Sequence, residues 1–148
     1  MLTRLLSFSF FKRHRDYGVL FLRLLIGTFI IYGVQDNILS SERMQEFEKF
    51  LAARGVPATA TAARLSVYAQ FICGLSILLG AWIRLTSLVF IINFISAIVI
   101  AHLGDPFQRM FPALMMIAAG FFFLFHGAGP LSIDALLDRS DRHRNATK

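Results

Sequence analysis

Four long apolar segments, separated by shorter polar ones, dominate the pattern of hydrophobic and polar positions along this chain. An apolar stretch of about 20 residues can cross a ~30 Å hydrocarbon core as an α-helix. Short links between consecutive spans make neighbouring helices antiparallel, which favours a bundle. We therefore predict an all-α membrane protein, a four-transmembrane-helix bundle that forms one membrane domain over residues 1–148. The predicted spans are residues 17–36, 64–82, 85–103 and 109–126.

The polar stretch between the first two spans predicts one further helix. Ser41 can cap it, and Met44, Phe47, Phe50 and Leu51 recur on one helical face. We expect a short amphipathic periplasmic helix that lies on the membrane surface or packs as a lid over the bundle. After the fourth span, residues 138–148 form a charged tail, for which we expect no ordered structure.

The positive charges indicate an orientation. The net charge is +6 and the mean hydropathy is +0.62, a combination that favours membrane lipid over nucleic acid as the partner of the basic residues. The N-terminal basic cluster, the turn at Arg84 and the basic tail all fall on one side of the predicted bundle. The positive-inside rule assigns that side to the cytoplasm, so both termini of this multi-pass protein are expected there, in a bacterial inner (plasma) membrane.

Two arginines are candidate contacts, Arg23 inside the first span and Arg84 between the second and third. Arg23 is about 9 Å below Tyr17 at 1.5 Å per residue, and an arginine at the bilayer centre costs ~3 kcal/mol on insertion scales. Snorkelling toward the head groups would lower that cost, which makes Arg23 an interfacial anchor. The alternative is an anion or head-group contact inside the bundle. Arg84, in the short turn between the second and third spans, is predicted to be an interfacial or head-group contact.

Polar residues at helical spacing mark three stripes that we expect to face the bundle interior. One interpretation is that they form interhelical hydrogen bonds. The other is a ligand pocket near the outer leaflet, lined by Tyr32, Gln35, Gln70 and His102. The stripes are Thr28, Tyr32 and Gln35 in the first span; Ser66, Gln70, Cys73 and Ile77 in the second; and Thr86, Phe90, Asn93 and Ala97 in the third.

Candidate chemistry is sparse. The one cysteine, Cys73, excludes an internal disulfide and thiol–disulfide exchange within the chain. His102 ends the third span, whereas His126 lies ~26 Å back across the membrane from Arg109. The two histidines cannot share a metal ion, so neither a metal nor a haem is predicted. No P-loop, GxSxG or HExxH motif is present, and no catalytic residue can be named.

Five short motifs lie in a fixed order along the chain. They are RLLIGTFIIYGVQ (Arg23–Gln35), FEKFLAARGVP (Phe47–Pro57), CGLSILLGAWIRL (Cys73–Leu85), His102 ahead of DPF, and GAGPLSIDALL (Gly127–Leu137). In these motifs and their order the chain resembles the DoxX family. The resemblance implies a four-helix inner-membrane protein. Its relatives include the small quinone-linked subunit of thiosulfate:quinone oxidoreductase and subunits of membrane oxidoreductase complexes that handle thiol or oxidative stress.

The chain departs from the family pattern at two positions. The family often has a histidine where this chain has Tyr32, and an acidic residue where it has Gln70. Both departures remove proton-handling groups, although tyrosine and glutamine can still hydrogen-bond a quinone carbonyl.

Three functions follow as hypotheses. The first is a small subunit of a membrane redox system, a quinone-linked oxidoreductase, with quinone as cofactor and a protein partner in the complex. The second is a non-enzymatic membrane scaffold or assembly partner. The third is a small transporter, which four helices without an intramembrane carboxylate support least. The sequence indicates no oligomeric state.

Overall fold

The computed structural model describes residues 14–146, so the N-terminal leader and the last two residues of the tail lie outside it. The described part of the chain is all-helical and contains no strand, which confirms the predicted fold class. In chain order its elements are α3 (Arg15–Leu39), α4 (Ser41–Ala52), α5 (Thr59–Leu79), α6 (Ile83–Ala97), the π-helix η1 (Ile98–His102), α7 (Phe107–His126) and α8 (Ile133–Ala146).

Within residues 14–146, four helical stretches are long and apolar enough to cross a membrane. They are Asp16–Leu39, Thr59–Leu79, Ile83–His102 and Phe107–His126. The second begins at Thr59, five residues before the predicted start at Arg64. The additional first residues are the small residues that follow Pro57, which extend the helix ahead of its apolar part. The chain is therefore an integral, multi-pass membrane protein by the length and composition of its helices.

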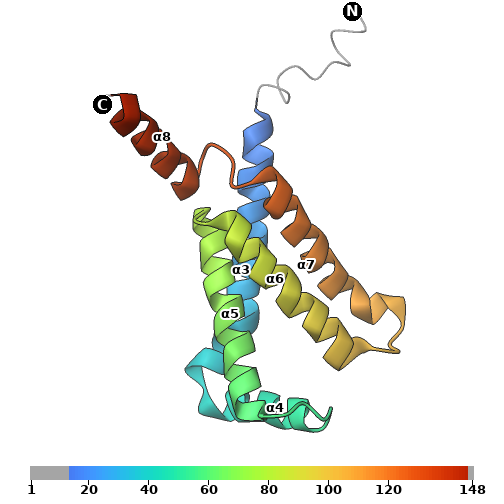
Figure 1. Ribbon diagram of the computed structural model, residues 1–148. Helices are drawn as coiled ribbons and strands as arrows, with labels where there is room; N and C mark the ends of the chain where they lie inside the picture. Colours follow the sequence, from blue (N-terminus) through green and yellow to red (C-terminus); the bar gives the residue numbers. More distant parts are fainter. Residues whose placement is uncertain (1–13, 147–148) are drawn as a thin grey trace, which may run out of the picture.

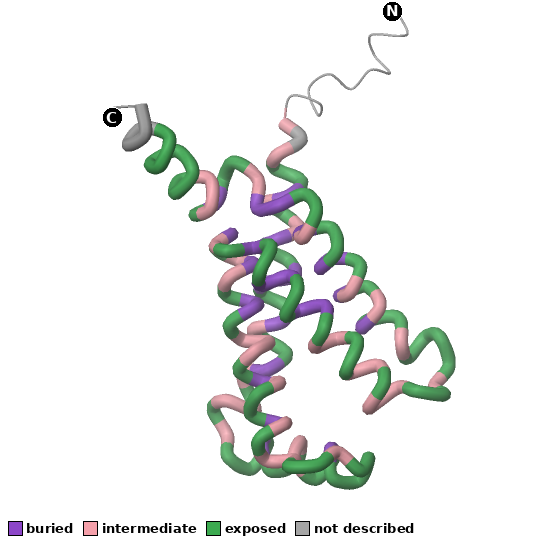
Figure 2. Tube along the Cα trace, viewed as in Figure 1, coloured by how far each residue is buried: buried purple, intermediate pink, exposed green. Residues whose placement is uncertain are grey.

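The spanning helices form two antiparallel pairs that share one core (Figure 1). Helix α3 packs along α5, α6 packs along α7, and contacts between α5 and α6 join the pairs. The buried core lies where all four meet, and its side chains are Ile26, Ile30, Cys73, Ile77, Ile83, Phe90, Met116, Ala119, Phe123 and Ala128. Most outward-facing residues are exposed (Figure 2), as expected for side chains that contact lipid.

The two pairs lie close together at the end of the bundle where α3 begins and α8 lies, which we call the terminal end (Figure 1). Toward the opposite end, α6 and α7 run obliquely away from α3 and α5, and α4 crosses beneath α3 and α5. Helix α4 packs against both of these helices and buries Met44 and Leu51. The short helix predicted between the first two spans is confirmed and packs as a lid, while its periplasmic side remains a prediction.

Glycines set the closest approach between α3 and α5. A Cβ added to Gly27 would lie 2.8 Å from the carbonyl oxygen of Gly74, and one added to Gly74 would lie 3.2 Å from the carbonyl oxygen of Gly27. The first distance is shorter than real Cβ contacts and the second is tighter than most of them, so a side chain at either position would push the two helices apart. The pair follows the general rule that small residues let transmembrane helices approach closely.

At the terminal end, the side chain of Arg23 in α3 connects the end of α5 with the loop that follows α7. Its side chain is only 2 % exposed. Nε donates to the carbonyl of Ile77 (2.9 Å) and Nη2 to that of Leu78 (3.0 Å), both in the last turn of α5. Nη1 donates to the carbonyls of Ala128 (2.9 Å) and Leu131 (2.8 Å), in the loop that follows α7. Four carbonyl oxygens from two distant segments thus share one guanidinium.

The expectation that Arg23 is an interfacial or head-group contact is therefore wrong. The last carbonyls of a helix lack partners within that helix, and a cation near a helix C-terminus is favourable. Arg23 meets both needs inside the protein, so its charge does not have to reach the head groups. Gly80, which ends α5 with φ +66, leaves the space for it, since a Cβ there would lie 2.5 Å from the guanidinium carbon.

The loop after α7 is fixed by further caps. Both carboxylate oxygens of Asp134 accept from the first backbone N–H groups of the α6 turn, those of Trp82 (2.6 Å) and Ile83 (3.0 Å). Ser132 Oγ accepts from the N–H of Ala135 (3.1 Å) and so caps α8. The expected unstructured tail is wrong for residues 138–146, because this cap starts a helix that continues through Ala146.

We predict that Arg23→Leu lowers the free energy of unfolding by about 3 kcal/mol or more, because buried carbonyls would lose their donors. Thermal unfolding in a mild detergent, followed by circular dichroism, measures the effect. Arg109→Leu is the matched control, since that side chain is 73 % exposed and its carboxylate partner lies 3.9 Å away. Equal stability of the two variants would contradict the role of Arg23.

We also predict that Gly27→Ala destabilises the protein by about 1–3 kcal/mol, because the new methyl group must push α3 and α5 apart. Gly33→Ala should be neutral or slightly stabilising, since nothing lies within 4 Å of its added Cβ and alanine is the better helix former. The same unfolding measurement compares the two, and a loss of stability of the same size in Gly33→Ala would argue against helix crossing as the cause.

Candidate functional site

A cavity of about 510 Å³ lies between α4, α5 and α6, at the end of the bundle opposite the terminal end. Its volume is in the range of roughly 300–1,000 Å³ that is usual for small-molecule sites. The walls are mostly apolar, with four polar side chains among them. The lining residues are Phe47, Phe50, Leu51, Val56, Ala62, Leu65, Ser66, Ala69, Gln70, Val89, Ile92, Asn93, Phe94, Ser96, Ala97, Ile100 and Ala101.

Three polar side chains of this cavity form one directional chain of hydrogen bonds. Gln70 Nε2 donates to Ser66 Oγ (3.2 Å), and Ser66 Oγ donates to Asn93 Oδ1 (2.9 Å). Because the Ser66 hydroxyl donates its proton to Oδ1 of Asn93, this hydrogen bond leaves the amide nitrogen of Asn93 without an acceptor. That atom is buried and has no hydrogen-bond partner among the described residues.

An unpaired amide nitrogen is costly in an apolar setting. A buried polar group without a partner costs roughly 1–3 kcal/mol, and such groups are rare in folded proteins. Asn93 lines the cavity, but its amide nitrogen exposes less than 1 Å² of surface, so an acceptor in the cavity reaches it only when the side-chain amide turns toward that space. The arrangement is suited to a ligand with an apolar body and a carbonyl oxygen.

The four residues predicted to line one pocket are not brought together. Gln70 lines the cavity. Tyr32 is 71 % exposed on the outer surface of α3, and Gln35, which is half-buried, does not line the cavity. His102 ends η1 and pairs with Asp105, with 3.1 Å between Nδ1 and the carboxylate.

Helix α3 explains this difference. Its buried face is formed by Arg23, Ile26, Ile30 and Val34, so the stripe of Thr28, Tyr32 and Gln35 faces elsewhere. The spacing of Thr28, Tyr32 and Gln35 does place them on one face of α3, but spacing alone does not show which face of the helix packs against the bundle. Arg23 and Gly27 fix that face, since both must point toward α5.

The stripes of α5 and α6 do face inward, and their polar members pair as interhelical hydrogen bonds. Ser66 donates to Asn93, and Thr86 Oγ1 lies 2.7 Å from the hydroxyl of Ser76, a residue of α5 outside the predicted stripe. Sequence reasoning placed Asn93 on the correct face but did not identify it as a site residue. The sequence contained an indication of this role. The turn between α5 and α6 is short, so the two helices are antiparallel, and Asn93 then lies opposite Ser66 and Gln70.

The aromatic wall was also missed. Phe47 and Phe50 of α4 line the cavity, although the sequence indicated only that they share an apolar face. The π-helix contributes Ile100 and Ala101. Such single π turns are frequent at functional sites.

The remaining candidates lie away from this cavity. Arg84 is exposed near the terminal end, where it lines a second cavity. Residues 14–146 contain no group of three or more His, Cys, Asp or Glu side chains that could hold a metal ion. Cys73 is buried and contacts the carbonyl of Thr86 through its sulfur at 3.6 Å.

Comparison with known proteins gives one match. The profile of the DoxX family matches residues 18–103, more than half of the chain and the segment that contains α4, α5, α6 and η1. Searches of curated proteins and of solved structures found no significant match. The matched segment contains every residue that lines the cavity between α4, α5 and α6. The chain therefore belongs to the DoxX family.

Proposed function

We propose that this protein is a small membrane subunit of a quinone-linked redox system and that it binds the quinone ring in the cavity between α4, α5 and α6. The observation that carries the proposal is the buried, unpaired amide nitrogen of Asn93 on the wall of an apolar cavity. A quinone offers a carbonyl acceptor on an apolar ring, which is the chemistry this nitrogen lacks.

The rest of the cavity agrees with such a ligand. Phe47, Phe50 and Phe94 supply aromatic surface for a flat ring. Gln70 lies one turn from Ser66 and holds the hydrogen-bond chain that orients Asn93. The chain thus binds and orients the ring through Asn93, while Ser66 and Gln70 act as positioning residues.

When bound, a quinone supplies the capacity to accept two electrons and two protons. The cavity contributes no group that exchanges protons near neutral pH, because the lining residues within the described chain include no Asp, Glu, His, Lys or Arg. We infer that this subunit holds the quinone and excludes water, and that a protein partner in the complex supplies the electrons.

We further propose a bacterial inner-membrane location with the terminal end in the cytoplasm. Arg15 at the start of α3 and Arg139 and Arg142 of α8 lie at that end, together with Arg84. This distribution supports the positive-inside orientation. It would place α4 and the quinone cavity toward the periplasmic leaflet.

The test is the amount of quinone that copurifies with the protein from its own membranes in a mild detergent, measured by extraction and liquid chromatography. We predict that Asn93→Leu lowers the quinone-to-protein ratio about tenfold, which corresponds to the loss of one buried hydrogen bond of about 1.4 kcal/mol. Tyr32→Phe is the control and should retain the wild-type ratio, since Tyr32 lies on the outer surface of α3.

A measurement of thermal stability shows whether Asn93→Leu loses quinone because the binding site is altered or because the protein is unfolded. Asn93→Leu removes the unpaired nitrogen and also the Oδ1 that accepts from Ser66, so the quinone-free protein should lose about one hydrogen bond and unfold only a few degrees below the wild type. If the wild-type protein carries no quinone but copurifies with a stoichiometric protein partner, the redox assignment fails and the scaffold function replaces it. Equal loss of quinone in Tyr32→Phe would also contradict this location.

A further inference from the structure

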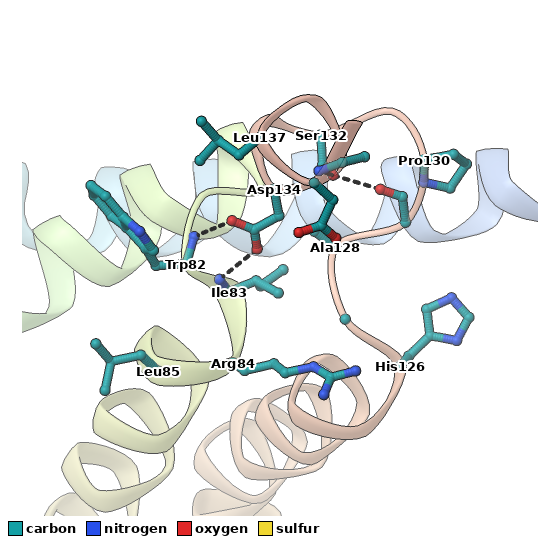
Figure 3. A pocket seen from close by; sticks show the side chains of 14 residues that line it. Trp82, Ile83, Arg84, Leu85, His126, Ala128, Pro130, Ser132, Asp134 and Leu137 are labelled. Atoms are coloured by element: carbon teal, nitrogen blue, oxygen red, sulfur yellow. Dashed lines mark hydrogen bonds between the residues drawn. The ribbon is translucent and has the colours of Figure 1, made fainter. Parts of the chain in front are cut away.

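A second cavity, of about 810 Å³, lies at the terminal end (Figure 3). Its walls are the turn at the start of α6, the end of α7 with its following loop, and the first turns of α8. It shares no lining residue with the proposed quinone cavity. Its chemistry is also different, because charged side chains reach it from two helices.

Arg84 brings a positive charge to this cavity. Within residues 14–146 its guanidinium forms no hydrogen bond or ion pair, unlike that of Arg23. The side chain extends along the loop side of the cavity toward the region of His126 (Figure 3). Its Nε and Nη2 lie 3.9 Å from the position that a Cβ on Gly127 would take, so the guanidinium lies against the loop that follows α7.

The same wall supplies further donors. The His126 ring stacks on Phe122, with 5.0 Å between ring centroids and 9° between planes, which leaves its edge nitrogens unoccupied by the described chain. The backbone N–H groups of Ala128 and Gly129 also form no hydrogen bond with the described residues. A guanidinium beside free N–H groups is a common arrangement for binding phosphate oxygens.

The opposite wall carries negative charge. Asp134 is already engaged, since its two oxygens cap the α6 turn. Asp138 lies one turn further along α8, lines the cavity and has no ion-pair partner in the described part of the chain. A simple anion would meet repulsion from Asp138, and a simple cation would meet repulsion from Arg84. A zwitterion satisfies both.

We propose that this cavity binds the head group of a zwitterionic phospholipid that carries a primary ammonium group. Its phosphate lies at Arg84 and His126, and its ammonium group lies at Asp138. The rim favours a lipid over a soluble phosphate ester, because Trp82, Leu85 and Leu137 are 71 %, 68 % and 48 % exposed and can contact acyl chains. Tryptophan is also enriched at the membrane–water interface.

Native mass spectrometry after delipidation and incubation with equal amounts of phosphatidylethanolamine and phosphatidylglycerol tests this site. The wild type should retain phosphatidylethanolamine in preference. Arg84→Gln should lower its retention about tenfold, as expected when a charge-assisted phosphate contact is lost. Asp138→Asn should abolish the preference for phosphatidylethanolamine over phosphatidylglycerol, because the carboxylate that pairs with the ammonium group and repels a net negative lipid is lost.

Arg139→Gln is the matched control, since it removes an exposed charge from the same helix without lining the cavity, and it should behave as the wild type. Neither cavity variant should change the quinone-to-protein ratio, which keeps the two sites distinguishable. Unchanged lipid preference in Asp138→Asn, or loss of lipid in Arg139→Gln of the same size, would overturn the proposal. Displacement of the lipid by equimolar soluble phosphoethanolamine would overturn the lipid assignment and indicate a site for soluble phosphate esters.

Discussion

The arrangement of this bundle depends on one buried guanidinium that donates hydrogen bonds to four backbone carbonyls. Two of those carbonyls end α5 and two belong to the loop after α7. Lipid cannot supply donors to such groups, so an unpaired helix end inside the hydrocarbon region would be costly. By placing Arg23 there, the chain ties α3, α5 and the start of α8 into one joint. Gly80 makes the joint possible because only a residue without Cβ leaves room for the side chain.

Because polar contacts hold the helices together at the terminal end, the two helix pairs can separate at the opposite end. There α6 and α7 run away from α3 and α5, and the space between α5 and α6 is closed by α4 rather than by a fourth spanning helix (Figure 1). The result is a cavity between α4, α5 and α6 whose polar groups come from facing stripes on two antiparallel helices. The amide nitrogen of Asn93 is the group in these stripes that finds no hydrogen-bond acceptor among the described residues.

The proposed division of labour follows from the character of these cavities. The cavity between α4, α5 and α6 has apolar walls and amide or hydroxyl groups, which can hold a carbonyl compound but do not move protons near neutral pH. In the redox system proposed above, the catalytic groups would therefore come from a protein partner. The terminal-end cavity has separated charges and an apolar rim, which suit a head group at the interface.

The sequence by itself determined the four spanning helices, their membrane character, the short lid helix and the family, because apolar length and helical periodicity are local properties. It also placed the α5 and α6 stripes on the inner face. Only the tertiary structure decided that Tyr32 faces outward, that Asn93 and Gln70 share a cavity, and that Arg23 is buried. Helical spacing shows which residues lie on one face, but the choice of the buried face depends on partners more than 50 residues away, here the carbonyls that Arg23 reaches.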